Sequence, residues 1–297
     1  MDTRHENRIS IAGIVVSVLL GVGVALAGST GSVEAGGLAV FAIAAILAYV
    51  INWAVFVPSY LARTETYFDL TGSTCYVVLV VVSVALSDDL DGRAVAVAVA
   101  VVIWAVRLGS FLFRRVRRES GDGRFDRIKH DALRFLMTWS LQALWVLLTL
   151  AAALAVITAE DRRGADAFLV AGMTVWLAGF VVEVVADQQK RAFRADPAND
   201  GRFITSGLWA WSRHPNYFGE ITLWTGIAIT ALPILSGWRW LMLISPDFVV
   251  VLLTRISGIP MLERRAEARW GGDPEFRAYT DTTPVLIPRR PRRRRIV

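Results

Sequence analysis

The densest polar segment of this sequence is S-R-H-P-N-Y-F-G-E, which leads directly into an apolar run. Pro215 favours the first turn of a helix, where its missing N–H would have no partner anyway. Asn216 and Glu220 are then one turn apart and share a face of that helix. A carboxylate inside a membrane span is costly, so Glu220 marks a candidate functional site. The plainer alternative, in which Arg213 and His214 only contact lipid headgroups, stays open.

A mixed strip of charge ends another long apolar run. Its members recur at three- and four-residue spacing and therefore share one face of a helix: Glu183, Asp187, Lys190, Arg191 and Arg194. Carboxylates accept ribose hydroxyls and arginines bind phosphates, so the strip fits a nucleotide-like ligand. Intrahelical ion pairs are the alternative, but Glu183 lies too deep in the apolar run for that explanation to cover it.

Two further segments could contribute chemistry. In the loop G-D-G-R-F-D, glycines expose backbone N–H groups beside Arg124, which suits a phosphate, although the pattern alone has low specificity. Tyr67 and Asp69 open a third candidate segment, where a carboxylate beside a phenol could polarise a carbonyl group by hydrogen bonding. The same spacing equally fits an acidic helix start that favours the helix dipole.

Composition places these segments in a membrane. The chain has 297 residues, is 55% hydrophobic and has a mean hydropathy of +0.48. Its apolar residues form blocks about twenty residues long, each enough to cross the hydrocarbon core as a helix. We therefore expect an all-α polytopic bundle of about eight spans, with seven as the alternative because only two residues separate the last two runs. The expected spans are Ile9–Gly28, Gly37–Val57, Leu70–Leu86, Ala94–Phe113, Phe135–Ile157, Ala167–Ala186, Tyr217–Leu235 and Trp238–Ile259.

Basic residues are distributed unequally between the two sides of this bundle. One side receives only four of them in the expected loops: Arg93, Arg162, Arg163 and Arg239. By the positive-inside rule the other, richer side is cytoplasmic, and both termini lie there. The expected location is the inner membrane of the cell.

The remaining composition excludes several classes of protein. A formal charge of +6 is explained by basic loops and a basic tail at anionic headgroups, so we expect no nucleic-acid partner. A single cysteine, Cys75, excludes an intrachain disulfide and a cysteine-rich metal site, and no metal is expected. Gly21, Gly23 and Gly28 follow no strand and are not a dinucleotide fingerprint; they predict close helix packing.

Taken in order, these segments resemble the steroid 5-alpha-reductase-type membrane family, in particular a bacterial branch of it. The blocks that carry the resemblance are R-L-G-S-F-L-F-R-R, D-G-R-F-D, W-S-L-Q-A-L-W, E-V-V-A-D-Q-Q, R-A-F-R-A-D-P-A-N, the R-H-P-N-Y-F-G-E segment, S-G-I-P-M-L-E and T-P-V-L-I-P. They cover roughly Arg107 to Pro288. The resemblance implies a catalytic domain in 113–288, preceded by N-terminal spans in 1–112. The low-complexity, arginine-rich composition of 289–297 predicts a disordered basic tail.

The resemblance also implies an activity. Such proteins take NADPH from the cytoplasmic side and transfer hydride to an enone or similar activated double bond of a lipid-like substrate. The cofactor contacts that follow are Arg124, Glu183, Asp187, Arg194, Asn216 and Glu220, with Arg213, His214 and Tyr217 of the same segment.

The catalytic residues match the family less closely. The glutamate–tyrosine pair that polarises the substrate carbonyl in the steroid enzymes corresponds only loosely to Asp69, with Tyr67 or Tyr76 as the tyrosine. Glu220 is the third expected catalytic residue, as a nearby acid that supplies a proton. The family's histidine has no counterpart at 256–258, where Ile-Ser-Gly stands.

Two other functions stay open. R-H-P-N-Y-F-G followed by a glutamate–arginine helix also resembles membrane methyltransferases that bind S-adenosylmethionine, although Glu220 and the acidic strip do not fit them. A non-catalytic lipid-binding protein on an inherited fold is the third possibility. The amphipathic helix itself, with Glu263, Arg264, Glu267 and Arg269, is expected to close the cytoplasmic mouth of the bundle.

Overall fold

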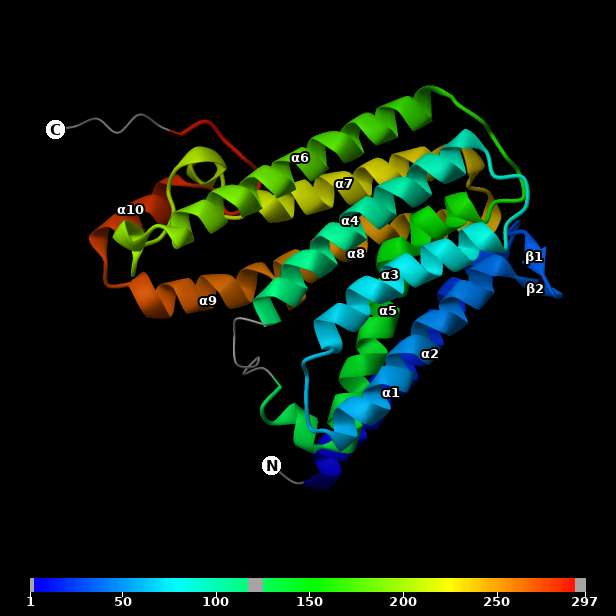
Figure 1. Ribbon diagram of the computed structural model, residues 1–297, viewed down its shortest axis with the longest axis horizontal. Coiled ribbons are helices and arrows are strands. Elements are labelled where there is room, and N and C mark those ends of the chain that lie inside the picture. The colour runs from blue at the N-terminus through cyan, green and yellow to red at the C-terminus, as the bar shows by residue number, and fades with distance from the viewer. Residues whose placement is uncertain (1–2, 117–124, 292–297) are drawn as a thin grey trace. The chain divides into compact units, whose positions relative to one another are not determined.

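The computed structural model describes residues 3–116 and 125–291 (Figure 1). Arg124, predicted to contact a phosphate, and most of the predicted basic tail fall outside the described residues. Within the described residues the only strands are β1 (Glu34–Ala35) and β2 (Leu38–Ala39), which pair antiparallel. The all-α prediction is confirmed. The long helices are α1 (Thr3–Ser29), α2 (Val40–Leu61), α3 (Phe68–Ala85), α4 (Gly92–Val116), α5 (Ala132–Ile157), α6 (Ala167–Ala195) and α7 (Pro215–Ala231), followed by α8 (Ile244–Val251), α9 (Ile259–Trp270) and α10 (Pro274–Thr282).

Eight helical segments of the described chain are long and apolar enough to cross a membrane, so the expected count of eight is confirmed. Two of them extend well beyond the predicted ends. The sixth continues to Ala195, because the charged strip after Ala186 remains helical. The eighth runs from the 3-10 helix η5 (Gly237–Leu243) through α8 and the π-helical turn η6 (Leu252–Ile256) into α9. The chain is therefore a polytopic helical membrane protein.

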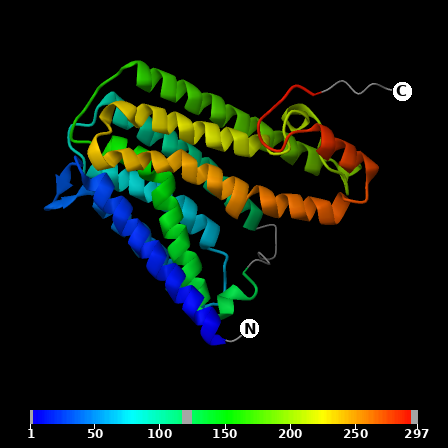
Figure 2. The same cartoon turned by 180° about the vertical axis from the view of Figure 1, so that it is seen from behind.

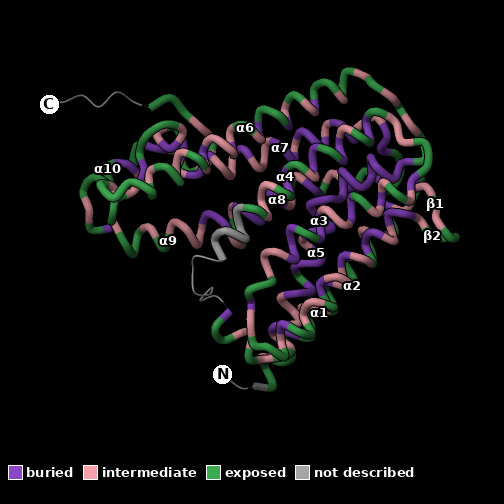
Figure 3. The backbone as a smooth tube through the Cα atoms, viewed as in Figure 1, coloured by how far each residue is buried: buried purple, intermediate pink, exposed green. Residues whose placement is uncertain are grey.

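The chain forms two compact units that are discontinuous in sequence. The first comprises residues 1–170 and 228–245, and the second 171–227 and 246–297. In the first unit α5 is the central helix, because it packs against α1, α2, α3 and α4 and is buried along most of its length (Figure 3). The predicted three-part division concerns roles rather than compact units, and it stays a prediction.

In the second unit, glycines bring the backbones of α6 and α7 into direct contact. The two helices run side by side in opposite directions (Figures 1 and 2). A Cβ atom added to Gly179 would lie 2.5 Å from the backbone nitrogen of Leu223, and one added to Gly226 would lie 2.5 Å from that of Trp176. Gly219 faces Glu183 in the same way, at 2.6 Å. No side chain larger than hydrogen fits at this helix contact.

The sequence predicted that Gly21, Gly23 and Gly28 of the first span allow close helix packing, and the structure supports this in part. A Cβ atom on Gly21 would meet the ring of Tyr49, and one on Gly28 would meet that of Phe41, so both accept aromatic side chains rather than a neighbouring backbone. Gly23 has no neighbour within 4 Å. Close packing therefore holds for two of these glycines only.

In the first unit, Arg93 at the start of α4 joins three segments of the chain. Its side chain is almost fully buried, at 1% exposure, and forms a 2.7 Å ion pair with the carboxylate of Asp166. It also donates to the backbone oxygens of Thr230, at 2.5 Å, and Gly164, at 3.2 Å. Because a buried guanidinium needs several acceptors, this set of partners explains why a charge is tolerated here.

Two more of the four basic residues on the sparsely charged side have the same role. Arg239, also buried, donates to the backbone oxygen of Gly31 at 2.9 Å and to that of Ala155. Arg162 donates to Ile157, at 3.0 Å, at the carboxyl end of α5, where the free carbonyls favour a cation. These arginines bind backbone oxygens at or near helix ends, which explains why basic residues occur on the side of the bundle that otherwise has few of them.

Candidate nucleotide-binding site

A pocket of about 310 Å³ lies in the second unit, between the carboxyl end of α6, the segment before α7, α9 and α10. Six of the lining residues carry positive charge: Lys190, Arg194, Arg202, Arg213, Arg265 and Arg269. Glu263 is the one acidic residue among the described lining residues. An excess of cations in a concave site attracts an anionic ligand, and arginines in particular bind phosphate.

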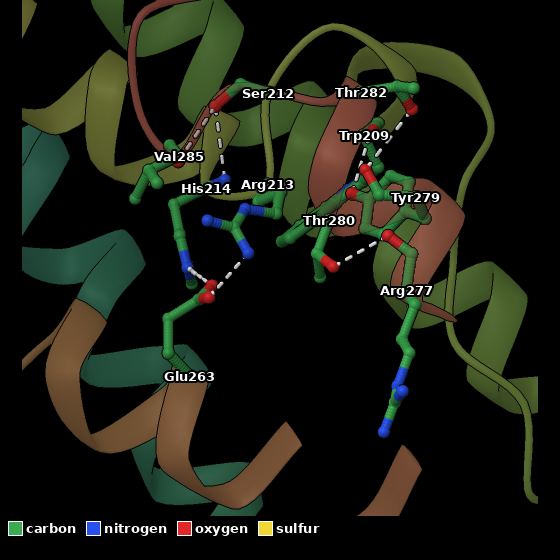
Figure 4. Close-up of polar contacts among 10 residues, drawn as sticks. All are labelled: Trp209, Ser212, Arg213, His214, Glu263, Arg277, Tyr279, Thr280, Thr282 and Val285. Atoms are coloured by element: carbon green, nitrogen blue, oxygen red, sulfur yellow. Dashed lines mark hydrogen bonds and ion pairs between the residues drawn. The ribbon is translucent and has the colours of Figure 1, made fainter. Parts of the chain in front are cut away.

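The single carboxylate of the pocket is already engaged (Figure 4). Glu263, on α9, forms a 2.7 Å ion pair through Oε2 with Arg213. Its other oxygen, Oε1, lies 2.7 Å from Nε2 of His214. The imidazole ring of His214 stacks on Tyr217, with ring centroids 5.6 Å apart and an interplanar angle of 10°. Glu263 is paired in this way with Arg213 and His214, and it forms no ion pair with the other described basic side chains of the pocket.

The segment that follows α10 is hydrogen-bonded to the segment that carries Arg213 and His214. Arg213 donates its backbone N–H to Pro284 at 2.9 Å, and Ser212 donates its hydroxyl to the backbone oxygen of Leu286 at 2.8 Å. Ser212 Oγ also accepts the backbone N–H of His214, at 3.1 Å (Figure 4). Backbone oxygens of the T-P-V-L-I-P block therefore fix the position of the R-H-P segment.

Aromatic rings form the rest of the pocket wall. Phe203 contacts Trp270, Phe276 and Tyr279, with ring centroids 5.8, 5.1 and 5.8 Å away. Tyr279 donates its hydroxyl to the backbone oxygen of Trp209 at 2.7 Å, and burial raises the pKa of this phenol well above its ordinary value. Aromatic faces beside arginines suit a ligand that combines a planar base with phosphate.

Of the residues predicted to bind cofactor, three line the pocket: Arg194, Arg213 and His214. Tyr217 is next to it, stacked on the ring of His214. Arg194 is exposed, whereas His214 is buried, so the predicted residues supply both an exposed and a buried part of the pocket lining.

Glu183, Asp187, Asn216 and Glu220 do not line the pocket but lie along the adjoining stretch of α6 and α7. The contact between Gly219 and the backbone of Glu183 places Glu183 and Glu220 at the same level of this helix pair. Asp187, one turn further along α6, then lies at the level of the start of α7, where Asn216 stands. Glu183 is buried and the other three are half-buried. The structure thus places these four predicted residues on neighbouring turns of α6 and α7, in the same unit as the pocket.

The predicted catalytic pair Tyr67 and Asp69 belongs to the first unit. Tyr67 is 52% exposed, and its backbone oxygen accepts the hydroxyl of Thr71. Asp69 is half-buried in the first turn of α3, and Ser73 donates to its backbone oxygen at 3.2 Å. Their catalytic role stays a prediction, as does that of Glu220.

Four of the residues that line the pocket were not predicted from the sequence: Arg202, Phe203, Arg265 and Trp270. The feature that could have indicated two of them, Arg265 and Trp270, is the amphipathic helix after the last span. This helix was expected to close the cytoplasmic mouth of the bundle, and as α9 it forms one wall of the pocket. Among the described residues, no group of three or more His, Cys, Asp or Glu side chains is placed to hold a metal ion.

Acidification is expected to destabilise the second unit through His214. Burial lowers the pKa of this imidazole below its ordinary value of 6.5, although Glu263 opposes that shift. The unfolded chain therefore binds more protons than the folded one in the window between the two pKa values. Stability is fully present above about pH 6.5 and falls as the pH drops through that window. Between about pH 7.5 and about pH 5.5, the free energy of unfolding should fall less for His214→Gln than for the parent protein. Equal decreases in the two proteins would show that His214 does not cause the acid destabilisation.

The fold and the site define a polytopic helical membrane protein with a basic, aromatic-walled pocket. The family described as a protein of unknown function, DUF1295, matches residues 52–283, and the chain belongs to this family. The predicted resemblance to steroid 5-alpha-reductases is confirmed at this level. No solved structure matches the chain.

Three curated relatives show how far the similarity extends. The chain is 28% identical over 130 residues to 3-oxo-5-alpha-steroid 4-dehydrogenase 1 of Mus musculus, covering 44% of this chain and 45% of that protein. The Rattus norvegicus protein of the same name matches at 28% over 130 residues, covering 44% of each chain. A probable O-methyltransferase of Ustilaginoidea virens is 32% identical over 85 residues, 28% of this chain and 30% of its own. Each alignment spans less than half of the relative's length.

Proposed function

We propose that this protein is a membrane-embedded reductase that uses NADPH to reduce an enone or similar activated C=C bond in a lipid-like substrate. The observation that carries the proposal is the pocket, where six basic residues surround one carboxylate that is already paired. The similarity to two steroid 4-dehydrogenases supports the reaction class. Methyl transfer is less well supported, because its relative matches a shorter segment.

The residues of the pocket fit the phosphate-bearing part of such a cofactor. At about 310 Å³ the pocket is at the small end of the range for ligand sites, which suits one nucleotide half of a dinucleotide. Lys190, Arg194 and Arg213 would bind phosphate oxygens, and the aromatic wall would contact the base. Asp187 and Glu183, on the adjoining turns of α6, would accept ribose hydroxyls. When bound, NADPH supplies the hydride, which is delivered to carbon while an acid of the protein supplies the proton.

The proposed setting follows from the charge asymmetry. The pocket lies at the end of α6 that carries most of the basic residues, so we place it on the cytoplasmic side of the inner membrane. The basic loops and tail would contact anionic headgroups there, and a lipid-like substrate would reach the bundle from the bilayer.

Arg194→Gln is expected to weaken NADPH binding by about tenfold, because the pocket loses one charge-assisted phosphate contact. Arg191→Gln is the matched control: Arg191 is on the same helix and exposed but does not line the pocket. Binding is measured by the fluorescence of NADPH on the full chain in mild detergent. Equal affinity of both variants and the parent would contradict the assignment of the pocket.

The same purified protein distinguishes the alternatives. Saturable binding of S-adenosylmethionine, with none of NADPH, would support a methyltransferase. Failure to bind either compound would favour a non-catalytic lipid-binding protein. Saturable binding of NADPH, followed by its oxidation with an added enone lipid, would support the reductase.

A further inference from the structure

Glu263 holds two side chains of the pocket from the opposite wall. Its carboxylate oxygens are 2.7 Å from Arg213 Nη1 and 2.7 Å from His214 Nε2, so each oxygen has one partner (Figure 4). Arg213 and His214 precede α7, whereas Glu263 is one turn into α9. An ionised carboxylate only accepts hydrogen bonds, so a neutral His214 must donate to it through Nε2.

That tautomer leaves the other ring nitrogen of His214 as an acceptor. Nδ1 is buried, in a side chain that is 7% exposed, and has no hydrogen-bond partner among the described residues. The ring cannot easily turn to find one, because it stacks flat on Tyr217. A buried acceptor without a partner is unfavourable, and a ligand that supplies an N–H or O–H group would satisfy it.

The charged groups that face His214 favour its neutral form. Lys190 on α6 and the neighbouring Arg213 oppose its protonation, whereas Glu263 on α9 favours it. Burial adds to the effect of the two cations and prevails over Glu263. The pocket therefore contains a neutral ring nitrogen that can accept a hydrogen bond, beside several cationic donors.

We propose that Glu263 is a positioning residue that holds His214 in the Nε2–H tautomer, so that Nδ1 accepts a hydroxyl or amino hydrogen of the bound nucleotide. This inference rests on the proposed function of the pocket. It adds a recognition element that basic residues alone cannot supply: phosphate is bound by the cations, while a neighbouring ribose hydroxyl or base amino group is read by His214. A ligand with phosphate but without such a donor, such as inorganic pyrophosphate, would leave Nδ1 unpaired.

Nitrogen NMR on ¹⁵N-histidine-labelled protein tests this directly, because the chain has only three histidines. The signal of His214 is assigned with His214→Gln. In the parent, Nε2 should be protonated and Nδ1 should not, and saturating NADPH should shift Nδ1 in the direction of an accepted hydrogen bond. Pyrophosphate should leave Nδ1 unchanged.

Glu263→Gln should populate both tautomers, since an amide can accept or donate, and should raise the Kd for NADPH about tenfold. Glu267→Gln, an exposed carboxylate one turn further along α9, should change neither quantity. A protonated Nδ1 in the parent overturns the inference, even if the variant fails to fold. Tight NADPH binding with an unchanged Nδ1 overturns this inference alone, whereas failure of the parent to bind NADPH overturns the proposed function as well.

Discussion

Gly219→Val is expected to prevent stable folding of the second unit. A Cβ atom at this position would lie 2.6 Å from the backbone nitrogen of Glu183 and 2.6 Å from the backbone oxygen of Gly179. Neither atom can rotate away as a side chain can, so α6 and α7 would have to separate. Overpacking against side chains costs about 1–3 kcal/mol, and we expect a larger loss against backbone. Gly219→Ala should be milder but still clearly destabilising.

The control for this prediction is Gly23→Val in α1. It makes the same change in a membrane helix at a glycine with no neighbour within 4 Å. The intrinsic effect of replacing glycine in a helix is thereby matched, and only the helix contact differs. Thermal unfolding in detergent, followed by circular dichroism, gives both stabilities. If the two variants unfold together near the parent's midpoint, α6 and α7 are not in backbone contact.

The contact between α6 and α7 explains why glycine stands at position 219, in the R-H-P-N-Y-F-G-E segment. Gly219 stands between Asn216 and Glu220, and its missing side chain is what allows α7 to approach Glu183. The predicted cofactor residues on the two helices are therefore brought to one level by glycine rather than by contacts of their own. A milder variant such as Gly219→Ala should accordingly weaken nucleotide binding together with stability.

The spans were predictable because the thickness of the bilayer sets their length, and length can be counted along the sequence. The glycine contact also left a trace, since Gly172 and Gly179 on one helix and Gly219 and Gly226 on the other are each seven residues apart. A seven-residue spacing returns to nearly the same face of a helix. We predicted close packing at the glycines of the first span instead, where their spacing is irregular.

The pocket was only partly predictable, because its walls come from distant parts of the chain. Arg194 and Arg213 stood beside motifs that pointed to a nucleotide, whereas Arg265 and Arg269 had the pattern of an ordinary interfacial helix. Periodicity shows which face of α9 is charged but not what that face meets. The pairing of Glu263 with Arg213 joins segments about fifty residues apart, which no local pattern indicates.

Arg93→Ala is expected to lower the stability of the first unit by about 1–3 kcal/mol, the cost of leaving buried hydrogen-bonding groups without a partner. The side chain is 1% exposed, and its removal leaves the carboxylate of Asp166 without its 2.7 Å partner. The backbone oxygens of Thr230 and Gly164 lose a donor in the same step. Arg93→Lys should recover part of the lost stability, because the ammonium group keeps the positive charge. It should not recover all of it, because an ammonium lacks the planar guanidinium geometry that reaches three acceptors.

Arg163→Ala is the matched control for charge on this side of the bundle, since Arg163 is exposed and close in sequence to Asp166. If Arg93 acted only through topology, as a basic residue on the sparsely charged side, both variants would change membrane orientation and neither would change stability. The structure instead requires that orientation be unaffected and that only Arg93→Ala unfold at lower temperature. Cysteine-accessibility labelling of each terminus measures orientation independently of unfolding. Equal stability of Arg93→Ala and Arg163→Ala would show that the buried guanidinium does not hold these chain segments together.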